Sequence, residues 1–308
     1  MKYSPVEVRR FAESLQANAQ IQNIPIDLLE KDIWITYILR ELRSLDESNH
    51  LAFKGGTCLV KAYFGYYRFS EDIDFTWFGP KIDRRKFRNR VLGATIDALA
   101  LEWDRQVSQG TGIAGSHSGG IFSYFLLSPS RDSTSVKLKI TVAFDEKLAF
   151  TPLLRKLGHV PIGNEIKRYL TLTFGDIAAG YFDVNEFWCY TPKEIACEKV
   201  RALLTRRTQP ARSRDLMDLY NIASGKNLEK AAPPDEVRSK LASALKIRAY
   251  KSEYARITQN IETHLEQLVT ESATDPVFLT KVDSKNLDDF ARRLREYLEN
   301  EILAKARR

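Results

Sequence analysis

The fold is decided by residues 51–78, which read LAFKGGTCLVKAYFGYYRFSEDIDFTWF. The apolar run Leu51-Ala52-Phe53 is typical of a strand, and it ends at Lys54-Gly55-Gly56-Thr57. A helix is expected over residues 58–64. A second strand is expected over residues 70–78, where polar and apolar side chains alternate as in a half-buried strand. The order strand, glycine turn, helix, strand predicts an α/β centre.

Outward from this stretch, the patterns change along the chain. Two helices are expected over residues 5–45 and a helical segment over 83–105. Further strands are expected over residues 121–127, 135–144 and 168–174, and the chain is almost wholly helical from about residue 191. We therefore predict an α+β fold with a mixed β-sheet. Its three parts would be N-terminal helices packed on the core (1–45), a core (46–185) and a helical C-terminal domain (186–308).

Composition restricts the class of protein. The chain has 308 residues, of which 44% are hydrophobic and 28% charged, which is ordinary for a soluble protein with a sizeable core. Its three cysteines include no CxxC pair, which argues against a disulfide scaffold and against a thiolate zinc cluster. No apolar run approaches the roughly 20 residues of a membrane helix, and no leader peptide is visible. We expect a cytoplasmic protein.

Positive charge is concentrated in two segments. The formal net charge is +7. Residues 81–90 hold six basic residues and one acid, and residues 201–214 hold five arginines and no acid. Such clusters either form solvated helix faces or bind phosphate backbones. The second interpretation predicts RNA contacts by Arg84, Arg85, Arg88, Arg206 and Arg207.

The glycine turn and the second strand together favour phosphate chemistry. Glycines at a strand end let the backbone approach a bulky anion, and the following helix directs free N–H groups at it. Asp72 and Asp74 are two residues apart in a strand, so both side chains leave the same face. Two carboxylates on one face suit Mg²⁺ that bridges triphosphate oxygens. A Gly-Gly pair or an Asp-x-Asp motif found alone does not indicate a phosphate site. The two motifs together, in this order, are a specific sign of one.

The combined motif resembles the AbiEii family of nucleotidyltransferase toxins, relatives of the MenT toxins in the DNA polymerase beta-like superfamily. The resemblance starts from Lys54-Gly55-Gly56-Thr57 and from the run Arg68–Phe75, RFSEDIDF. Glu30-Lys31-Asp32 is similar to the family's leading helix. The family's helical motif is similar to Glu198–Ala202 (EKVRA), Arg207, Arg214-Asp215 and Asp218 of this chain. The resemblance covers about residues 25–220.

The resemblance implies an enzyme that transfers a nucleotide from an NTP to RNA, commonly to the 3′ end of tRNA, and so blocks translation. It implies Mg²⁺ as cofactor and a cognate antitoxin as protein partner, with no membrane partner. Asp72 and Asp74 would hold the metal, and Lys199 and Asp215 would join them as catalytic residues. The implied nucleotide-binding residues are Gly55, Gly56, Thr57, Ser70, Lys137, Lys139 and Asp218.

One position departs from the superfamily pattern. A third carboxylate usually follows on a later strand in a Lys-x-Asp/Glu pattern, but this chain reads Lys137-Leu138-Lys139. The base for the attacking hydroxyl is then Asp145 or Asp215, or the metal activates the hydroxyl. A catalytically inactive relative is also compatible with this departure. So are a transferase of the same fold that modifies a protein or small molecule, and a nucleic-acid-binding protein without catalysis.

Overall fold

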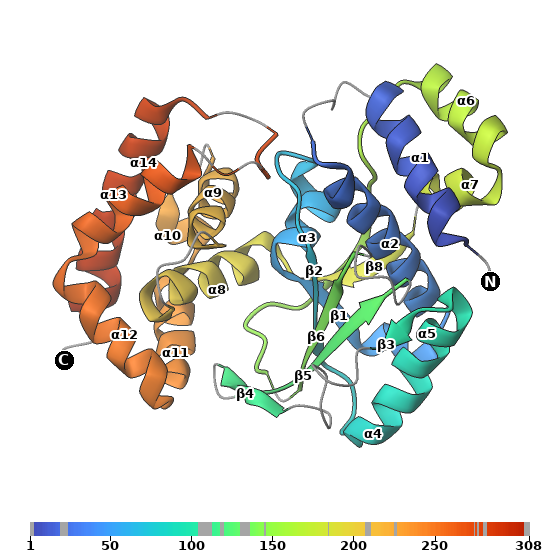
Figure 1. Cartoon of the computed structure of the whole chain (residues 1–308). Coiled ribbons are helices and arrows are strands. Elements are labelled where there is room, and N and C mark those ends of the chain that lie inside the picture. The colour runs from blue at the N-terminus through green and yellow to red at the C-terminus, as the bar shows by residue number, and fades with distance from the viewer. Residues whose placement is uncertain are drawn as a thin grey trace. The chain divides into compact units, whose positions relative to one another are not determined.

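The computed structural model divides the chain into two compact units (Figure 1). The first takes in residues 1–115, 122–144 and 153–189, and the second residues 116–121, 145–152 and 190–308. The structure describes residues 3–18, 24–103, 113–117, 120–129, 136–144, 146–183, 185–206, 211–224, 227–273, 275, 277–279 and 282–304. The three-part division expected from the sequence stays a prediction.

The strands form one mixed sheet in the order β3-β5-β6-β2-β1-β8-β7, with β4 paired to β5. The two strands expected around the glycine turn are β1 and β2, at its centre. The bounds are β1 Leu51–Lys54, β2 Asp72–Trp77, β3 Glu102–Trp103, β4 Ile113–His117, β5 Gly120–Ser128, β6 Leu138–Phe144, β7 Leu153–Lys156 and β8 Glu186–Cys189. An α+β fold with a mixed sheet is thereby confirmed.

The register of the three central strands places charged residues opposite one another. β1 runs antiparallel to β2, with Lys54 opposite Asp74. β6 runs parallel to β2, with Lys139 opposite Asp72 and Thr141 opposite Asp74. The intervening side chains of β2 and β6 are buried. Since side chains alternate between the two faces of a strand, the charged and polar residues share the other face.

Helices cover the sheet in the first unit, and α2 has eleven buried residues among its 18. It contacts α1, α5 and α7, and Tyr37 in its middle stacks on Tyr3 with ring centroids 4.0 Å apart. The bounds are α1 Pro5–Asn18, α2 Ile26–Arg43, the 3₁₀ helix η1 Asp46–His50, α3 Gly55–Leu59, the π-helix η2 Val60–Phe64, α4 Arg84–Phe87, the π-helix η3 Arg88–Leu92, α5 Gly93–Leu99, α6 Asn164–Phe174 and α7 Asp176–Phe182.

Two expectations about local structure are wrong. The helical segment expected over 83–105 ends early, because Ala100 takes a left-handed conformation (φ 51°) and β3 then pairs with β5. The strand expected over 168–174 is the second half of α6. There Leu170, Leu172 and Phe174 alternate with threonines, but only Leu170 is buried and Leu172 is 78% exposed. The threonine hydroxyls bond back to carbonyls four residues earlier, which a helix permits.

The second unit is helical, with α8 at its centre, where it contacts α9, α10, α11 and α12. α8 begins where the Thr191 hydroxyl accepts a hydrogen bond from the backbone N–H of Glu194 at 3.2 Å. The bounds are α8 Pro192–Thr205, α9 Ala211–Ala223, α10 Leu228–Ala231, α11 Pro234–Ala244, α12 Arg248–Gln259, α13 Ile261–Ser272, α14 Ser284–Tyr297 and the π-helix η4 Leu298–Leu303. In the part of the chain that the structure describes, no helix is both long and apolar enough to span a membrane.

Candidate functional site

Asp72 and Asp74 lie on one face of β2, as the sequence pattern predicts, with a lysine on each neighbouring strand. Lys139 of β6 places its ammonium 3.1 Å from Asp72 Oδ2. Lys54 of β1 lies opposite Asp74 in the register and is buried. The Asp72 side chain is 46% exposed, so the face opens to solvent at this end. Lys137, just before β6, is exposed.

The ionisation of Asp74 is disfavoured by its surroundings. The pKa of Asp74 is raised, first because the carboxyl is buried and then because of the negative charge of Asp72. The positive charges of Lys139 and Lys54 and a hydrogen bond from Thr141 act in the opposite direction. Burial and a like charge both disfavour the ionised form. A cation placed against this pair would therefore remove an unfavourable interaction that the fold contains.

The donor set fits Mg²⁺ delivered with a nucleotide. Mg²⁺ prefers hard oxygen ligands and is commonly held by one or two carboxylates, with phosphate oxygens and waters completing its shell. The described residues contain no group of three or more His, Cys, Asp or Glu side chains that could hold a metal ion. Two carboxylates on one strand face therefore match a site that needs the substrate to complete it.

The glycine turn is shaped by residues of this chain. Gly55 has a φ of +78°, and a Cβ there would lie 2.9 Å from Asp74 Oδ2. At Gly56 a Cβ would overlap Nη2 of Arg68. Arg68 is 3% exposed and donates to the carbonyl of Phe69 at 2.8 Å. The two glycines thus let a carboxylate of β2 and a buried guanidinium approach the turn.

Arg68 is a residue to which sequence reasoning gave no role. It stands at the start of the RFSEDIDF run, so its position in the motif was visible, but nothing in the local pattern indicates that it fills the space beside Gly56.

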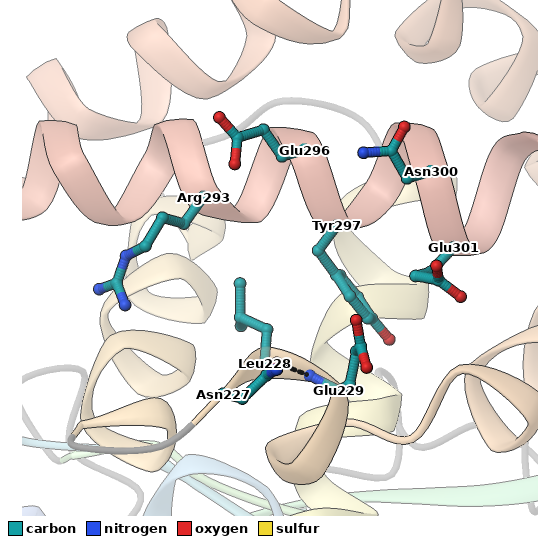
Figure 2. Close-up of a pocket in the computed structure, with 8 residues that line it drawn as sticks. All are labelled: Asn227, Leu228, Glu229, Arg293, Glu296, Tyr297, Asn300 and Glu301. Carbon is teal, nitrogen blue, oxygen red and sulfur yellow. Dashed lines mark hydrogen bonds between the residues drawn. The ribbon is translucent and has the colours of Figure 1, made fainter.

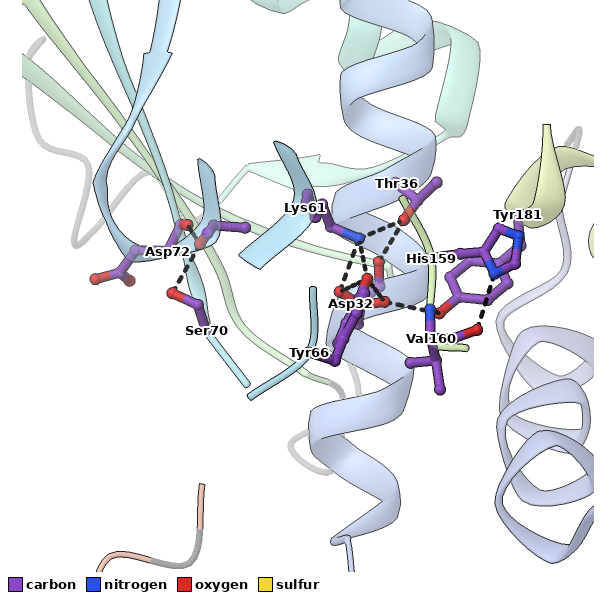
Figure 3. A network of polar contacts seen from close by, with 10 residues as sticks. Asp32, Thr36, Lys61, Tyr66, Ser70, Asp72, His159, Val160 and Tyr181 are labelled. Atoms are coloured by element: carbon purple, nitrogen blue, oxygen red, sulfur yellow. Dashed lines mark hydrogen bonds and ion pairs between the residues drawn. The ribbon is translucent and has the colours of Figure 1, made fainter. Parts of the chain in front are cut away.

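Thr57 and Ser70 connect the turn to the strand. The Thr57 hydroxyl donates to the backbone carbonyl of Asp72 and lies 2.8 Å from Ser70 Oγ. Figure 3 shows Ser70 and Asp72 on this connection. These hydroxyls fix the turn against the start of β2, so they position the carboxylates whether or not they also touch a nucleotide.

The Glu30-Lys31-Asp32 motif of α2 connects different parts of the first unit. Glu30 accepts a hydrogen bond from Arg9 of α1 at 2.8 Å. Lys31 pairs with Glu71 at 2.6 Å, and Glu71 is the residue immediately before Asp72. The ion pair between Lys31 and Glu71 therefore connects α2 to the start of β2, the strand that carries the two carboxylates.

Asp32 lies at the centre of a buried polar network (Figure 3). Its carboxylate is 2.8 Å from the ammonium of Lys61 and accepts hydrogen bonds from Tyr66 at 2.9 Å and Tyr181 at 2.8 Å. Lys61 also donates to Thr36 at 3.0 Å. The network joins α2, η2 and α7. Burial lowers the pKa of Lys61, and the charge of Asp32 acts against that effect. A buried pair with this many partners is a structural centre.

The predicted residues of the helical part form a second cluster, inside the second unit. Lys199 of α8 lies 2.5 Å from Asp215 Oδ1 and 2.8 Å from Asp218 Oδ2, both on α9. The three side chains are 14%, 6% and 0% exposed respectively. They are therefore buried ion pairs, and one ammonium serves two carboxylates. The structure brings these three residues together, as it brings Gly55, Asp72 and Asp74 together in the first unit.

Comparison with known proteins decides the family. The model of the nucleotidyl transferase AbiEii toxin family, of type IV toxin–antitoxin systems, matches residues 37–305. The chain belongs to the AbiEii family. It is thus a nucleotidyltransferase toxin of a toxin–antitoxin system.

Among curated proteins, none matches this AbiEii protein significantly. Similar solved structures include JHP933 from Helicobacter pylori, with 16% identity, a TM-score of 0.47 and coverage of 90% of this chain and 95% of that one. A candidate nucleotidyltransferase from H. pylori has 17% identity, a TM-score of 0.43 and coverage of 88% and 96%.

Several predicted residues of the AbiEii protein are not placed by the structure. Arg207 and Asp145 lie outside the described residues. The backbone of Arg84, Arg85 and Arg88 is described, but their side chains are not. Arg206 is half-buried at the end of α8. The predicted RNA contacts therefore stay predictions.

A pocket that the sequence did not indicate lies in the second unit of the AbiEii protein, between α10 and the helix that continues from α14 into η4 (Figure 2). Its volume is about 360 Å³. Its lining is mostly polar, and Tyr297 at its wall donates to the carbonyl of Ala232. The lining residues are Asn227, Leu228, Glu229, Arg293, Glu296, Tyr297, Asn300 and Glu301. None of the residues in the family motifs lines it.

Proposed function

We propose that this AbiEii enzyme transfers a nucleoside monophosphate from an NTP to a hydroxyl of RNA, in the first instance the 3′ end of tRNA. Family membership supports the transferase chemistry, and the carboxylate pair on β2 carries the assignment of the reacting centre. A nucleotide at the 3′ end would block aminoacylation and stop translation. The reaction joins the hydroxyl oxygen to the α-phosphorus, and pyrophosphate leaves.

Asp72 and Asp74 would hold Mg²⁺ against the triphosphate. The ion would supply charge neutralisation at the α-phosphate and the leaving pyrophosphate. Lys139 and Lys54 flank the two carboxylates on either side of β2, where they limit the local excess of negative charge. The turn at Gly55 and the hydroxyl of Ser70 hold the strand end in place for the incoming phosphates.

Lys199 and Asp215 have the roles that the family motif implies, a phosphate contact and a supporting carboxylate. Asp218 is fully buried and holds the ammonium of Lys199 at 2.8 Å. It is therefore a positioning residue for that lysine. A lysine held between two carboxylates has a fixed location, which is what a group that binds phosphate requires.

The base for the RNA hydroxyl is not supplied by β6. The residue of β6 opposite Asp72 is Lys139, and the residue opposite Asp74 is Thr141. An ammonium cannot accept a proton. Deprotonation of the hydroxyl is thus assigned to Asp215 or Asp145, or follows from the charge of the bound cation.

The test is nucleotide transfer from each of four α-³²P-labelled NTPs to purified tRNA, to total protein and to a mixture of small hydroxylated molecules. Label in tRNA that is lost on removal of its 3′-terminal nucleotide supports the proposal. Label only in protein or in small molecules would identify a different acceptor. Absence of label in every fraction, with Mg²⁺ present, would contradict the proposal.

A matched pair of variants makes this test specific. Asp74→Asn keeps the shape of the side chain and removes the charge that would bind the cation. Asp97→Asn makes the same change on the exposed surface of α5. Transfer should be lost in the first variant and kept in the second.

A further inference from the structure

Two arginines at the end of α8 have buried N–H groups that no acceptor of the described chain reaches. Arg201 is 5% exposed, and its Nε and Nη1 have no hydrogen-bond partner among the described residues. The same holds for Nε of Arg206, five residues later at the end of the same helix. In native proteins, buried polar groups are almost always hydrogen-bonded, so an unfilled pair of this kind indicates a missing acceptor.

Two other cationic side chains of the second unit have carboxylate partners. Lys199 lies between two carboxylates, and Arg214 pairs with Asp275 at 2.9 Å. Nε and Nη1 of Arg201 make no such bond to the described residues, although the negative charges of Glu198 and Glu146 act on its guanidinium and favour its charged form. The described part of the fold therefore gives the other two cations direct ion pairs, whereas Nε and Nη1 of Arg201 are left without an acceptor.

The electrostatics of Arg201 point in the same direction. Its pKa is lowered to about 10, first by burial and next by the positive charge of Arg206. The negative charges of Glu198 and Glu146 act in the opposite direction, yet the pKa of Arg201 stays lowered, and Nε of each arginine is without an acceptor among the described residues.

We propose that Arg201 and Arg206 together bind one phosphate group. The planar guanidinium presents N–H donors in a fork that matches phosphate oxygens, which a monatomic anion cannot match in the same way. Free phosphate, a nucleotide or an RNA backbone can each carry this group. The proposal does not depend on the carboxylate pair of β2, since neither arginine was assigned to the reacting centre; Arg206 is one of the residues predicted above to contact RNA.

The first test measures the melting temperature of the full chain in sodium phosphate and in sodium chloride of equal ionic strength. Phosphate should raise the melting temperature of the wild-type protein, because a ligand that binds the folded state stabilises it. Arg201→Gln and Arg206→Gln should each lose most of that rise. Arg292→Gln is the control, since Arg292 is exposed on α14 and pairs with Asp289.

The comparison in chloride adds a second readout. Arg201→Gln should melt no lower than the wild type there, because the substitution removes a buried charge that has no ion-pair partner in the described chain. Arg206 is half-buried, so Arg206→Gln still tests the site if the protein with Arg201→Gln does not fold. A full response to phosphate in either variant, or no response in the wild type, would overturn the proposal.

The final arm identifies the source of the phosphate, using an unstructured RNA oligonucleotide without NTP. If the RNA backbone fills the site, Arg201→Gln should weaken binding at least about tenfold. The slope of log K against log salt should then become shallower by roughly 0.7 for each phosphate that the variant no longer binds. Unchanged RNA binding together with an abolished response to inorganic phosphate assigns the site to free phosphate or nucleotide. The same assays in an Asp74→Asn background separate this site from the reacting centre.

Discussion

At the scale of single residues, Asp74 connects stability to function. Its buried carboxyl, next to Asp72, has a pKa above the ordinary value. The folded state therefore holds this proton more tightly than the unfolded chain does. In the absence of divalent cations, stability should fall as pH rises from the unfolded carboxyl pKa of about 3.9 through the higher folded value, and then level off.

Asp74→Asn should remove this fall with pH and also abolish transfer, by at least about 10²-fold, which is typical for loss of one group that stabilises charge at a reacting centre. Melting temperatures across pH 4–8 in EDTA and initial rates with Mg²⁺ test the two parts. Near wild-type transfer by Asp74→Asn would remove the metal-site assignment.

Lys199 has two possible roles, and the structure shows how to separate them. Its ammonium holds Asp215 and Asp218 together. Lys199→Met leaves two buried carboxylates without their cation and should cost about 3–5 kcal/mol of stability. Adding Asp218→Asn should restore part of that stability. If Lys199 contacts phosphate, the double variant stays inactive well below its melting temperature, whereas recovered transfer would mean that the lysine is purely structural.

At the scale of elements, the first turn of α3 depends on the absence of a side chain at Gly56. A Cβ there would overlap Nη2 of Arg68. Gly56→Ala should therefore cost about 1–3 kcal/mol, as overpacking of a filled site does. Gly163→Ala, before α6, is the control, because a Cβ there meets nothing within 4 Å. Urea denaturation measures both, and equal stabilities would mean that Arg68 moves aside without cost.

The Asp32 network should be the strongest connection between helices in the first unit. Asp32→Asn removes the charge that balances Lys61 and weakens the bonds from Tyr66 and Tyr181. We expect a loss of about 3–5 kcal/mol. Asp46→Asn, on an exposed part of η1, should change stability little. A small effect of Asp32→Asn, measured by denaturant unfolding, would show that packing alone holds α2, η2 and α7 together.

At the scale of the whole molecule, the net charge of +7 predicts salt-sensitive binding of RNA. The slope of log K against log salt should be roughly −0.7 per phosphate contacted on a single strand. Replacing Arg84 and Arg85 with Glu should flatten this slope. The control reverses two arginines of α14, Arg292 and Arg295. An unchanged slope in the first variant, or an equal change in both, would place the RNA away from residues 81–90.

Local patterns were sufficient to predict how the two carboxylates and the glycine turn of the candidate site are arranged. The side-chain period of a strand put Asp72 and Asp74 on one face, and the change from strand to helix at Gly55-Gly56 located the turn. The strand expected over residues 135–144 likewise contains β6, in which Leu138, Ile140 and Val142 are fully buried. These features depend on neighbours within a few residues, and that information is written directly in the sequence.

Local sequence patterns were not sufficient where the structure depends on contacts between residues far apart in the chain. The threonine alternation over 168–174 imitated a strand, although α6 forms there and packs against α1. The pairing of Lys139 with Asp72, residues far apart in the chain, follows from the register of β6 on β2. Arg68 beside Gly56 and the carboxylates around Lys199 depend in the same way on how elements pack.

The sequence by itself therefore determined the α+β class, the turn and the paired carboxylates, since local periodicity carries them. Only the tertiary structure decided that Lys199 is buried between carboxylates, that Asp32 is a structural centre, and that Arg201 lacks an acceptor among the residues described. The reason is physical: the energy of a charge depends on its burial and on the partners around it, and packing brings those partners from distant parts of the chain.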